Sequence, residues 1–258
     1  SLRRSNAKTV HAHSPGLAKR ESALTLSRMV HFTLFGIPVY IRPSFWVVLA
    51  IFGGALSISS VEDLIYPALF VIAGFIAILS HEMGHALVGR KLGGGQQTIV
   101  LELFGGLTSS HGMQLTRGGR ALMILAGPMM TLLLGIISLW LTWNIVAPVM
   151  TSYNLNFWDL AISPFTAALI SPKLYILSCL IMIGEWWTIL NLLPIYPLDG
   201  GQLIAQYIRS PRKVFMTGFI TAILIGLLSF QLFHGYFIPI FMALFAYSNY
   251  REYKNAPF

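Results

Sequence analysis

The sequence has 258 residues, of which 55% are hydrophobic and only 10% are charged. An average soluble domain has about 25% charged residues, so this composition argues against a soluble enzyme and favours a protein that lies in a lipid bilayer. The net charge of +8 requires no nucleic-acid partner, because cytoplasmic loops of membrane proteins collect Lys and Arg beside anionic headgroups.

The chain begins with a polar, basic segment that contains no apolar run of the kind found in a signal peptide. We expect residues 1–28 to form a flexible cytoplasmic tail. Residues 29–41 are rich in β-branched and aromatic side chains around Gly36-Ile37-Pro38. This pattern predicts a short hairpin at the membrane surface.

Six apolar stretches follow, and each is a candidate transmembrane helix. They run approximately from 44 to 59, 67 to 90, 121 to 146, 174 to 194, 214 to 233 and 236 to 250. The first and the last are short for a bilayer core of about 30 Å. With the N-terminus in the cytoplasm, every Lys and Arg except Lys173 falls on the cytoplasmic side, as the positive-inside rule requires. We therefore expect one membrane domain over 29–250 and a short cytoplasmic tail over 251–258.

Between the second and third stretches, residues 98–108 read TIVLELFGGLT, a β-prone run interrupted by Gly105-Gly106. In a bilayer such a segment must lie against protein or line a wet cavity, because bare strand edges leave amides unsatisfied. The sequence thus predicts an all-α polytopic membrane protein with about six transmembrane helices and a small membrane-associated β-hairpin or sheet. Cys179 is the only cysteine, so no internal disulfide is expected.

The second stretch contains His81-Glu82-Met83-Gly84-His85. Two histidines at this spacing lie on one helix face, about 6 Å apart along the axis, and can share one zinc ion through their ring nitrogens. The glutamate beside the first histidine can act as general base for a water whose pKa zinc lowers. The alternative is a pair of histidines bonded to neighbouring helices around a buried glutamate, but ionisable groups in hydrocarbon are costly and usually functional.

Asp199 is the candidate for a third ligand, which catalytic zinc sites usually have. Pro194 and Pro197 break the fourth span near its cytoplasmic end, so the unwound chain can turn a carboxylate into the core. The alternative role for Asp199 is an N-cap of the segment that follows. Four other residues are weaker candidates because they lie in loops, at span edges or mid-span: Glu102, His111, Glu185 and His234.

HEMGH and NLLPIYPLDGG resemble the two motifs of the site-2 protease family of intramembrane zinc metalloproteases. The resemblance implies Zn2+ as cofactor, metal ligands at His81, His85 and Asp199, and Glu82 as general base. It also implies Asn191 as a polar helper near the substrate carbonyl, although bonding between helices is the equal alternative. Softer matches lie at three short segments: Gly36-Ile37-Pro38, Phe104-Gly105-Gly106 and Ala126-Gly127-Pro128.

The sequence also departs from the family pattern. Many members carry Asn a few residues after Ala-Gly-Pro, where this chain has Met129, Met130 and Thr131. The expected form is short, without the PDZ and CBS domains that other members contain.

The expected function is hydrolysis of a peptide bond in or near a transmembrane segment of a single-pass or small membrane protein, as in regulated intramembrane proteolysis. The expected setting is the lipid bilayer of a prokaryotic cell (inner) membrane, with both termini cytoplasmic, no nucleic acid bound and the oligomeric state left open. Residues 98–108 either hold an unwound substrate by strand addition or plug the site. The competing functions are an inactive, metal-binding escort of membrane proteins and a metal transporter.

Overall fold

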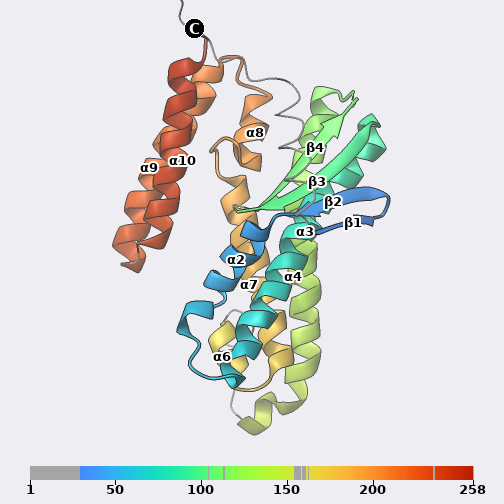
Figure 1. Cartoon of the computed structure of the whole chain (residues 1–258), viewed down its shortest axis with the longest axis vertical. Coiled ribbons are helices and arrows are strands. Elements are labelled where there is room, and N and C mark those ends of the chain that lie inside the picture. Colours follow the sequence, from blue (N-terminus) through green and yellow to red (C-terminus); the bar gives the residue numbers. More distant parts are fainter. Residues whose placement is uncertain are drawn as a thin grey trace, which may run out of the picture.

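The structure is a computed structural model that describes residues 30–103, 105–112, 114–153, 158, 161, 163–234 and 236–257. The tail expected over residues 1–28 lies outside these residues. Figure 1 shows a bundle of long helices, a small sheet near one end of the bundle, and a hairpin of two helices beside it. The fold is thus a helical bundle with a small sheet, as the sequence predicts.

The sheet contains four strands in the order β1-β2-β3-β4. Antiparallel pairs join β1 to β2 and β3 to β4, and β2 pairs with β3 in parallel. The first turn has positive φ at both Phe35 and Gly36, the geometry that suits a two-residue hairpin turn. The strands span Val30–Leu34 (β1), Ile37–Ile41 (β2), Gln96–Glu102 (β3) and Gly105–His111 (β4).

One face of the two central strands covers the helices. Ile37, Val39 and Ile41 of β2 alternate with exposed or half-buried residues, and Ile99 and Leu101 of β3 do the same. All five side chains are almost fully buried. This alternation is what fixes the register of a half-buried sheet. The strand order places β4 at one edge of the sheet.

Helix α2 (Pro43–Phe52) is shorter than the first predicted span. Gly53 and Gly54 end it, and Gly54 has a φ of 87°, which other residues rarely adopt. Ten residues rise about 15 Å, half the thickness of the hydrocarbon core. The short 3-10 helices η1 (Ala55–Ser57) and η2 (Glu62–Leu64) then lead into the next span.

Within the described residues, four helices are long and apolar enough to cross a membrane. Three of them, α3 (Ile65–Gly93), α4 (Arg117–Tyr153) and α7 (Pro172–Leu192), pack together, and α9 (Pro211–Phe233) pairs with α10. Helix α4 runs beyond the predicted end of its span at 146. The last helix, α10 (Phe237–Asn255), is polar at its C-terminal end.

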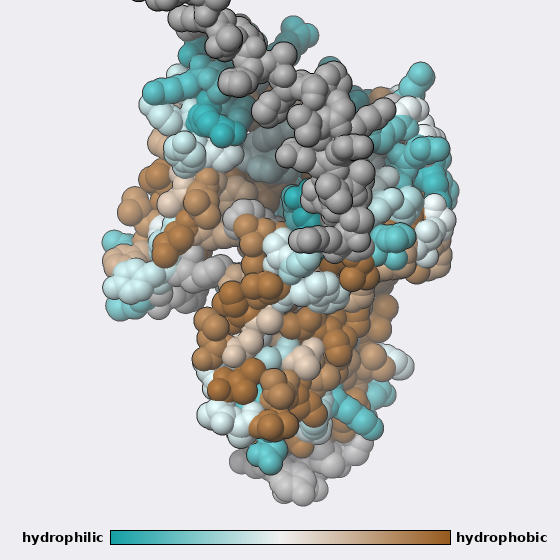
Figure 2. All heavy atoms as spheres, in the orientation of Figure 1, coloured by the Kyte–Doolittle hydropathy of each residue, from teal (hydrophilic) through white to brown (hydrophobic). Residues whose placement is uncertain are grey.

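Two short helices complete the fold, α6 (Pro164–Ala168) and α8 (Asp199–Ala205). Figure 2 shows a band of apolar residues across the middle of the molecule, with hydrophilic residues at the sheet and near the C-terminal helix end. This distribution suits a protein whose middle lies in hydrocarbon.

Candidate metal centre

The two histidines of HEMGH lie on one face of α3 and are buried. Their Nε2 atoms are 3.1 Å apart. The helix places them at this depth because Gly84 lets α3 approach α4 closely: a Cβ on Gly84 would lie 2.4 Å from the Ala126 carbonyl oxygen. The pair therefore faces α4 and the interior of the bundle rather than lipid.

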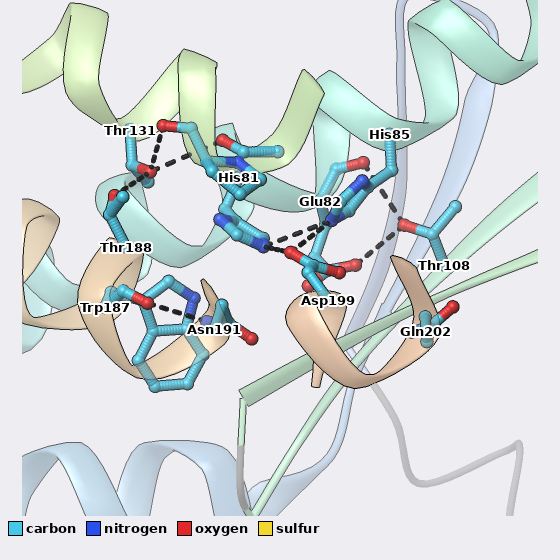
Figure 3. A network of polar contacts seen from close by, with 12 residues as sticks. His81, Glu82, His85, Thr108, Thr131, Trp187, Thr188, Asn191, Asp199 and Gln202 are labelled. Carbon is cyan, nitrogen blue, oxygen red and sulfur yellow. Dashed lines mark hydrogen bonds and ion pairs between the residues drawn. The ribbon is translucent and has the colours of Figure 1, made fainter. Parts of the chain in front are cut away.

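Asp199 completes the group from a separate part of the chain. Its Oδ2 atom lies 3.0 Å from Nε2 of His81 and 3.3 Å from Nε2 of His85 (Figure 3). Asp199 is the first residue of α8, and the residue at the N-cap position, Leu198, makes no side-chain cap. The carboxylate thus points to the histidines and does not serve as the helix cap.

The glycines after Asp199 allow this approach. A Cβ on Gly200 would lie 2.2 Å from the Leu192 carbonyl oxygen, and one on Gly201 would lie 2.4 Å from the backbone of Ile195. The start of α8 therefore folds back onto the end of α7 and the loop between them. Larger residues would push Asp199 away from the histidines.

The three side chains fit a divalent metal ion. At zinc–ligand distances of about 2.0–2.1 Å, tetrahedral ligand atoms lie about 3.3 Å from one another, close to the separations given above. His85 Nδ1 lies 2.8 Å from the Met123 carbonyl oxygen, so this nitrogen carries the proton and Nε2 presents its lone pair to the shared point. Among the described residues, this is the one group of three His, Cys, Asp or Glu side chains arranged to hold a metal.

Glu82 is buried beside the metal group but is not part of it. Thr108 of β4 donates a hydrogen bond from Oγ1 to Glu82 Oε2 at 2.7 Å. A Cβ on Gly106 would lie 2.1 Å from Glu82 Cγ, so the bare backbone of β4 packs directly on this side chain. The strand therefore fixes the orientation of Glu82 from the side opposite α3.

A cavity of about 420 Å³ opens on the metal group. Its polar wall includes Glu82, Asn191 and Gln202, and its apolar wall is formed by side chains of α7 and α10, namely Trp187, Phe241, Leu244 and Phe245. Residues of β4 line it as well. The cavity can therefore hold a peptide backbone beside polar groups and an apolar side chain against α10.

Asn191, the expected helper, is buried at this cavity. Its Nδ2 donates to the Trp187 carbonyl oxygen of its own helix at 2.9 Å. The weaker candidates lie elsewhere: Glu102 lines the cavity but pairs with Arg42 at 2.8 Å. The remaining three are exposed outside the metal group: His111, Glu185 and His234.

Comparison with known proteins identifies the family. Residues 69–233 match the sequence model described as Peptidase family M50. The chain belongs to peptidase family M50. The chain is therefore an integral membrane protein, in agreement with the length and apolar composition of α3, α4, α7 and α9.

Relatives of this M50 peptidase include zinc metalloprotease MJ0392 of Methanocaldococcus jannaschii, 28% identical over 227 residues, which cover 84% of this chain and 57% of the relative. Putative zinc metalloprotease sll0528 of Synechocystis sp. is 28% identical over 188 residues, covering 68% of this chain and 43% of that protein. The chain thus spans about half the length of these relatives. The solved site-2 protease from Methanocaldococcus jannaschii has the same fold, with a TM-score of 0.56, 24% identity and coverage of 87% and 95% of the two chains.

Thr131 is one of the three residues that follow Ala126-Gly127-Pro128 in α4. It is buried, and its Oγ1 lies 2.7 Å from Oγ1 of Thr188 on α7 (Figure 3). Its other contacts are the carbonyl oxygens of Gly127 and Pro128. The residue therefore ties α4 to α7 beside the metal group.

Sequence reasoning did not single out Thr108 as a functional residue. A signal was present, because successive side chains of a strand alternate between its faces. Gly106 and Thr108, two residues apart in a β-prone run, therefore share a face. The contribution of α10 to the cavity has no comparable signal, since it depends on how the α9–α10 hairpin docks.

Proposed function

We propose that this M50 family member is an intramembrane zinc metalloprotease that cleaves a peptide bond in or near a transmembrane segment of a membrane protein. The observation that carries the proposal is the meeting of His81, His85 and Asp199 at 3.0–3.3 Å, with Glu82 beside them. The names of the relatives as zinc metalloproteases support the same activity and metal.

Zinc held by these three side chains would supply Lewis acidity and lower the pKa of a water molecule. Glu82 would accept a proton from the water that attacks the carbonyl carbon and return it to the leaving amine. Thr108 holds the carboxylate in place for both transfers. Asn191, at the cavity wall, can donate to the substrate carbonyl once its amide turns from Trp187.

The substrate must reach this centre unwound, because a helical peptide keeps its carbonyls in internal hydrogen bonds. Strand β4 is an edge strand and lines the cavity, so an extended substrate can pair with its free backbone groups. This supports strand addition over a plug for residues 98–108. In this proposal the substrate is a single-pass or small membrane protein with a segment that unwinds readily. Its cleavage is the reaction expected in regulated intramembrane proteolysis.

The metal centre lies towards the cytoplasm in this proposal, with both termini on the same side of a prokaryotic cell membrane. The basic residues support this orientation, since Arg90 and Lys91 end α3, Arg212 and Lys213 begin α9, and Lys254 lies near the end of α10. Positively charged helix ends collect on the cytoplasmic face.

The proposal is tested by comparing new N-termini in membranes of cells that produce the wild-type chain or Asp199→Ala. Loss of one of three ligands removes the metal and with it the reaction. We expect fragments that begin inside or beside transmembrane segments only with the wild-type chain. Identical fragment sets at equal protein levels would reject the protease function.

Thr108→Val removes the hydrogen bond to Glu82 without touching a metal ligand. A hydrogen bond to a charged group contributes about 1.5–3 kcal/mol, so we expect turnover to fall about 10- to 100-fold with zinc content unchanged. Thr142→Val is the matched control, because Thr142 is buried in α4 and bonds only to the Ser138 carbonyl oxygen. Equal turnover in the two variants would show that Thr108 does not position the base.

A further inference from the structure

Helix α10 contacts the loop that precedes the third metal ligand, through one buried amide. Asn249 is 1% exposed. Its Nδ2 donates to the Tyr196 carbonyl oxygen at 2.6 Å and to the Phe245 carbonyl oxygen of its own helix at 2.9 Å. Both protons of the side-chain amide are thus used, and one of them joins two segments that are 53 residues apart.

The surroundings of Asn249 are shaped for this contact. A Cβ on Gly218 of α9 would lie 2.3 Å from Asn249 Oδ1 and 3.3 Å from the Ile195 Cα, so a glycine is needed where α9, α10 and the loop meet. The Tyr196 ring packs edge-to-face on Phe215 of α9, with centroids 5.5 Å apart. The hairpin therefore holds the loop by a hydrogen bond, a ring contact and close backbone packing.

The side-chain oxygen of Asn249 is buried without a partner in the described part of the chain, so the contribution of this residue comes from its NH2 group. Oδ1 has no hydrogen-bond partner among the described residues. Burying a polar atom in this way is unfavourable, and an apolar side chain would avoid it. What Asn249 contributes is therefore the bond that its Nδ2 donates to the Tyr196 carbonyl oxygen.

Close contacts connect the loop at Tyr196 to the start of α8, where Asp199 lies. The Leu198 amide donates to the Ile195 carbonyl oxygen at 2.8 Å, and Gly201 packs against the Ile195–Tyr196 peptide. The segment from 193 to 198 contains no helix or strand, so its position depends on these contacts. A metal ligand has to stay within about 0.5 Å of its productive position.

We propose that Asn249 is a positioning residue that holds the 193–198 loop so that Asp199 reaches the metal. This inference rests on the metal site of the proposed function. Helix α10 also forms the apolar wall of the cavity through Phe241, Leu244 and Phe245. The same helix therefore lines the substrate cavity and, through Asn249, sets the affinity for the metal.

The test uses Asn249→Leu and Asn249→Asp in the full chain, purified in detergent. Both variants keep the branched shape of Asn; leucine removes the donor and the buried Oδ1, and aspartate replaces the amide donor with an oxygen that donates only when it is protonated. Loss of a residue that orients a ligand weakens metal binding about 10- to 100-fold. We expect a rise of this size in the zinc dissociation constant, measured by competition with a chelator, and faster hydrogen exchange in residues 193–205.

Ser229→Ala is the matched control. Ser229 is buried in the same hairpin, and its hydroxyl donates only to the Gly226 carbonyl oxygen of its own helix. We expect wild-type zinc affinity and wild-type exchange at the loop in this variant. If Ser229→Ala weakens zinc binding as much as Asn249→Leu, the effect is general destabilisation and the inference is wrong.

Two further outcomes separate this inference from the proposed function. If Asn249→Leu has the zinc affinity and the loop exchange of the wild-type chain, the positioning role is wrong. In that case a His81→Ala variant that binds no zinc would still support the metal site. If His81→Ala binds zinc as tightly as the wild-type chain, both the metal site and the positioning role of Asn249 are wrong. Asn249→Leu therefore decides the positioning role even if Asn249→Asp does not fold.

Discussion

Glu82→Gln retains its zinc and loses about 100- to 10,000-fold in the rate of peptide cleavage, the usual contribution of a general base. Glutamine keeps the shape of the side chain and can still accept the hydrogen bond from Thr108. It cannot take the proton of the attacking water. Because Glu82 is not in the group of His81, His85 and Asp199, the metal affinity stays that of the wild-type chain.

The measurement is single-turnover cleavage, in lipid vesicles, of a substrate found by the comparison of N-termini, together with zinc content by elemental analysis. Glu62→Gln is the control, since Glu62 is exposed in η2 and the same change there leaves both quantities unaltered. Cleavage by Glu82→Gln at the wild-type rate would remove Glu82 as the base.

The same variant distinguishes the protease from the two other functions that the sequence left open. An escort or a transporter needs the metal group but no general base, so its activity would persist in Glu82→Gln. A transporter also needs ligands at several depths of the membrane. In the described part of the chain, the candidate ligands form one group, on α3 and at the start of α8.

Local sequence rules were sufficient to predict the metal group. The four-residue spacing of His81 and His85 places them on one face of a helix. The prolines after Leu192 end the fourth predicted span near that residue. The depth at which that helix ends then left Asp199 as the best third ligand. These arguments use only helix geometry, so they hold without knowledge of the packing.

Three other features were not predicted, of which the end of α2 and the bond of Asn191 are local and the contact of Asn249 is tertiary. Residues 44–59 are predicted as one apolar span, but the Gly53-Gly54 pair within them is a turn signal, and α2 ends there. Asn191, expected as a helper near the substrate carbonyl, donates to the carbonyl oxygen four residues before it in α7. The contact of Asn249 with Tyr196 joins segments whose proximity follows from the docking of a whole helical hairpin.

Gly127→Ala is expected to destroy the metal site although it changes no ligand. Gly127 lies in α4 where this helix passes the histidines. A Cβ there would lie 2.3 Å from Nε2 of His85 and 2.9 Å from Nε2 of His81, which is the space between the ligand atoms. The imidazoles must turn away to relieve this contact, and His85 then also loses its bond to Met123.

We expect zinc affinity to fall by about 100-fold or more. Disturbing a residue that only orients the ligands usually lowers metal affinity about 10- to 100-fold, and displacing two ligands lowers it further. Alanine is otherwise favoured over glycine inside a helix by roughly 0.5–1 kcal/mol. Gly135→Ala, in the same helix with nothing within 4 Å of the added Cβ, should therefore bind zinc normally and unfold at the wild-type temperature or above it. Gly127→Ala that binds zinc as tightly as Gly135→Ala would mean that the metal does not lie between these two nitrogens.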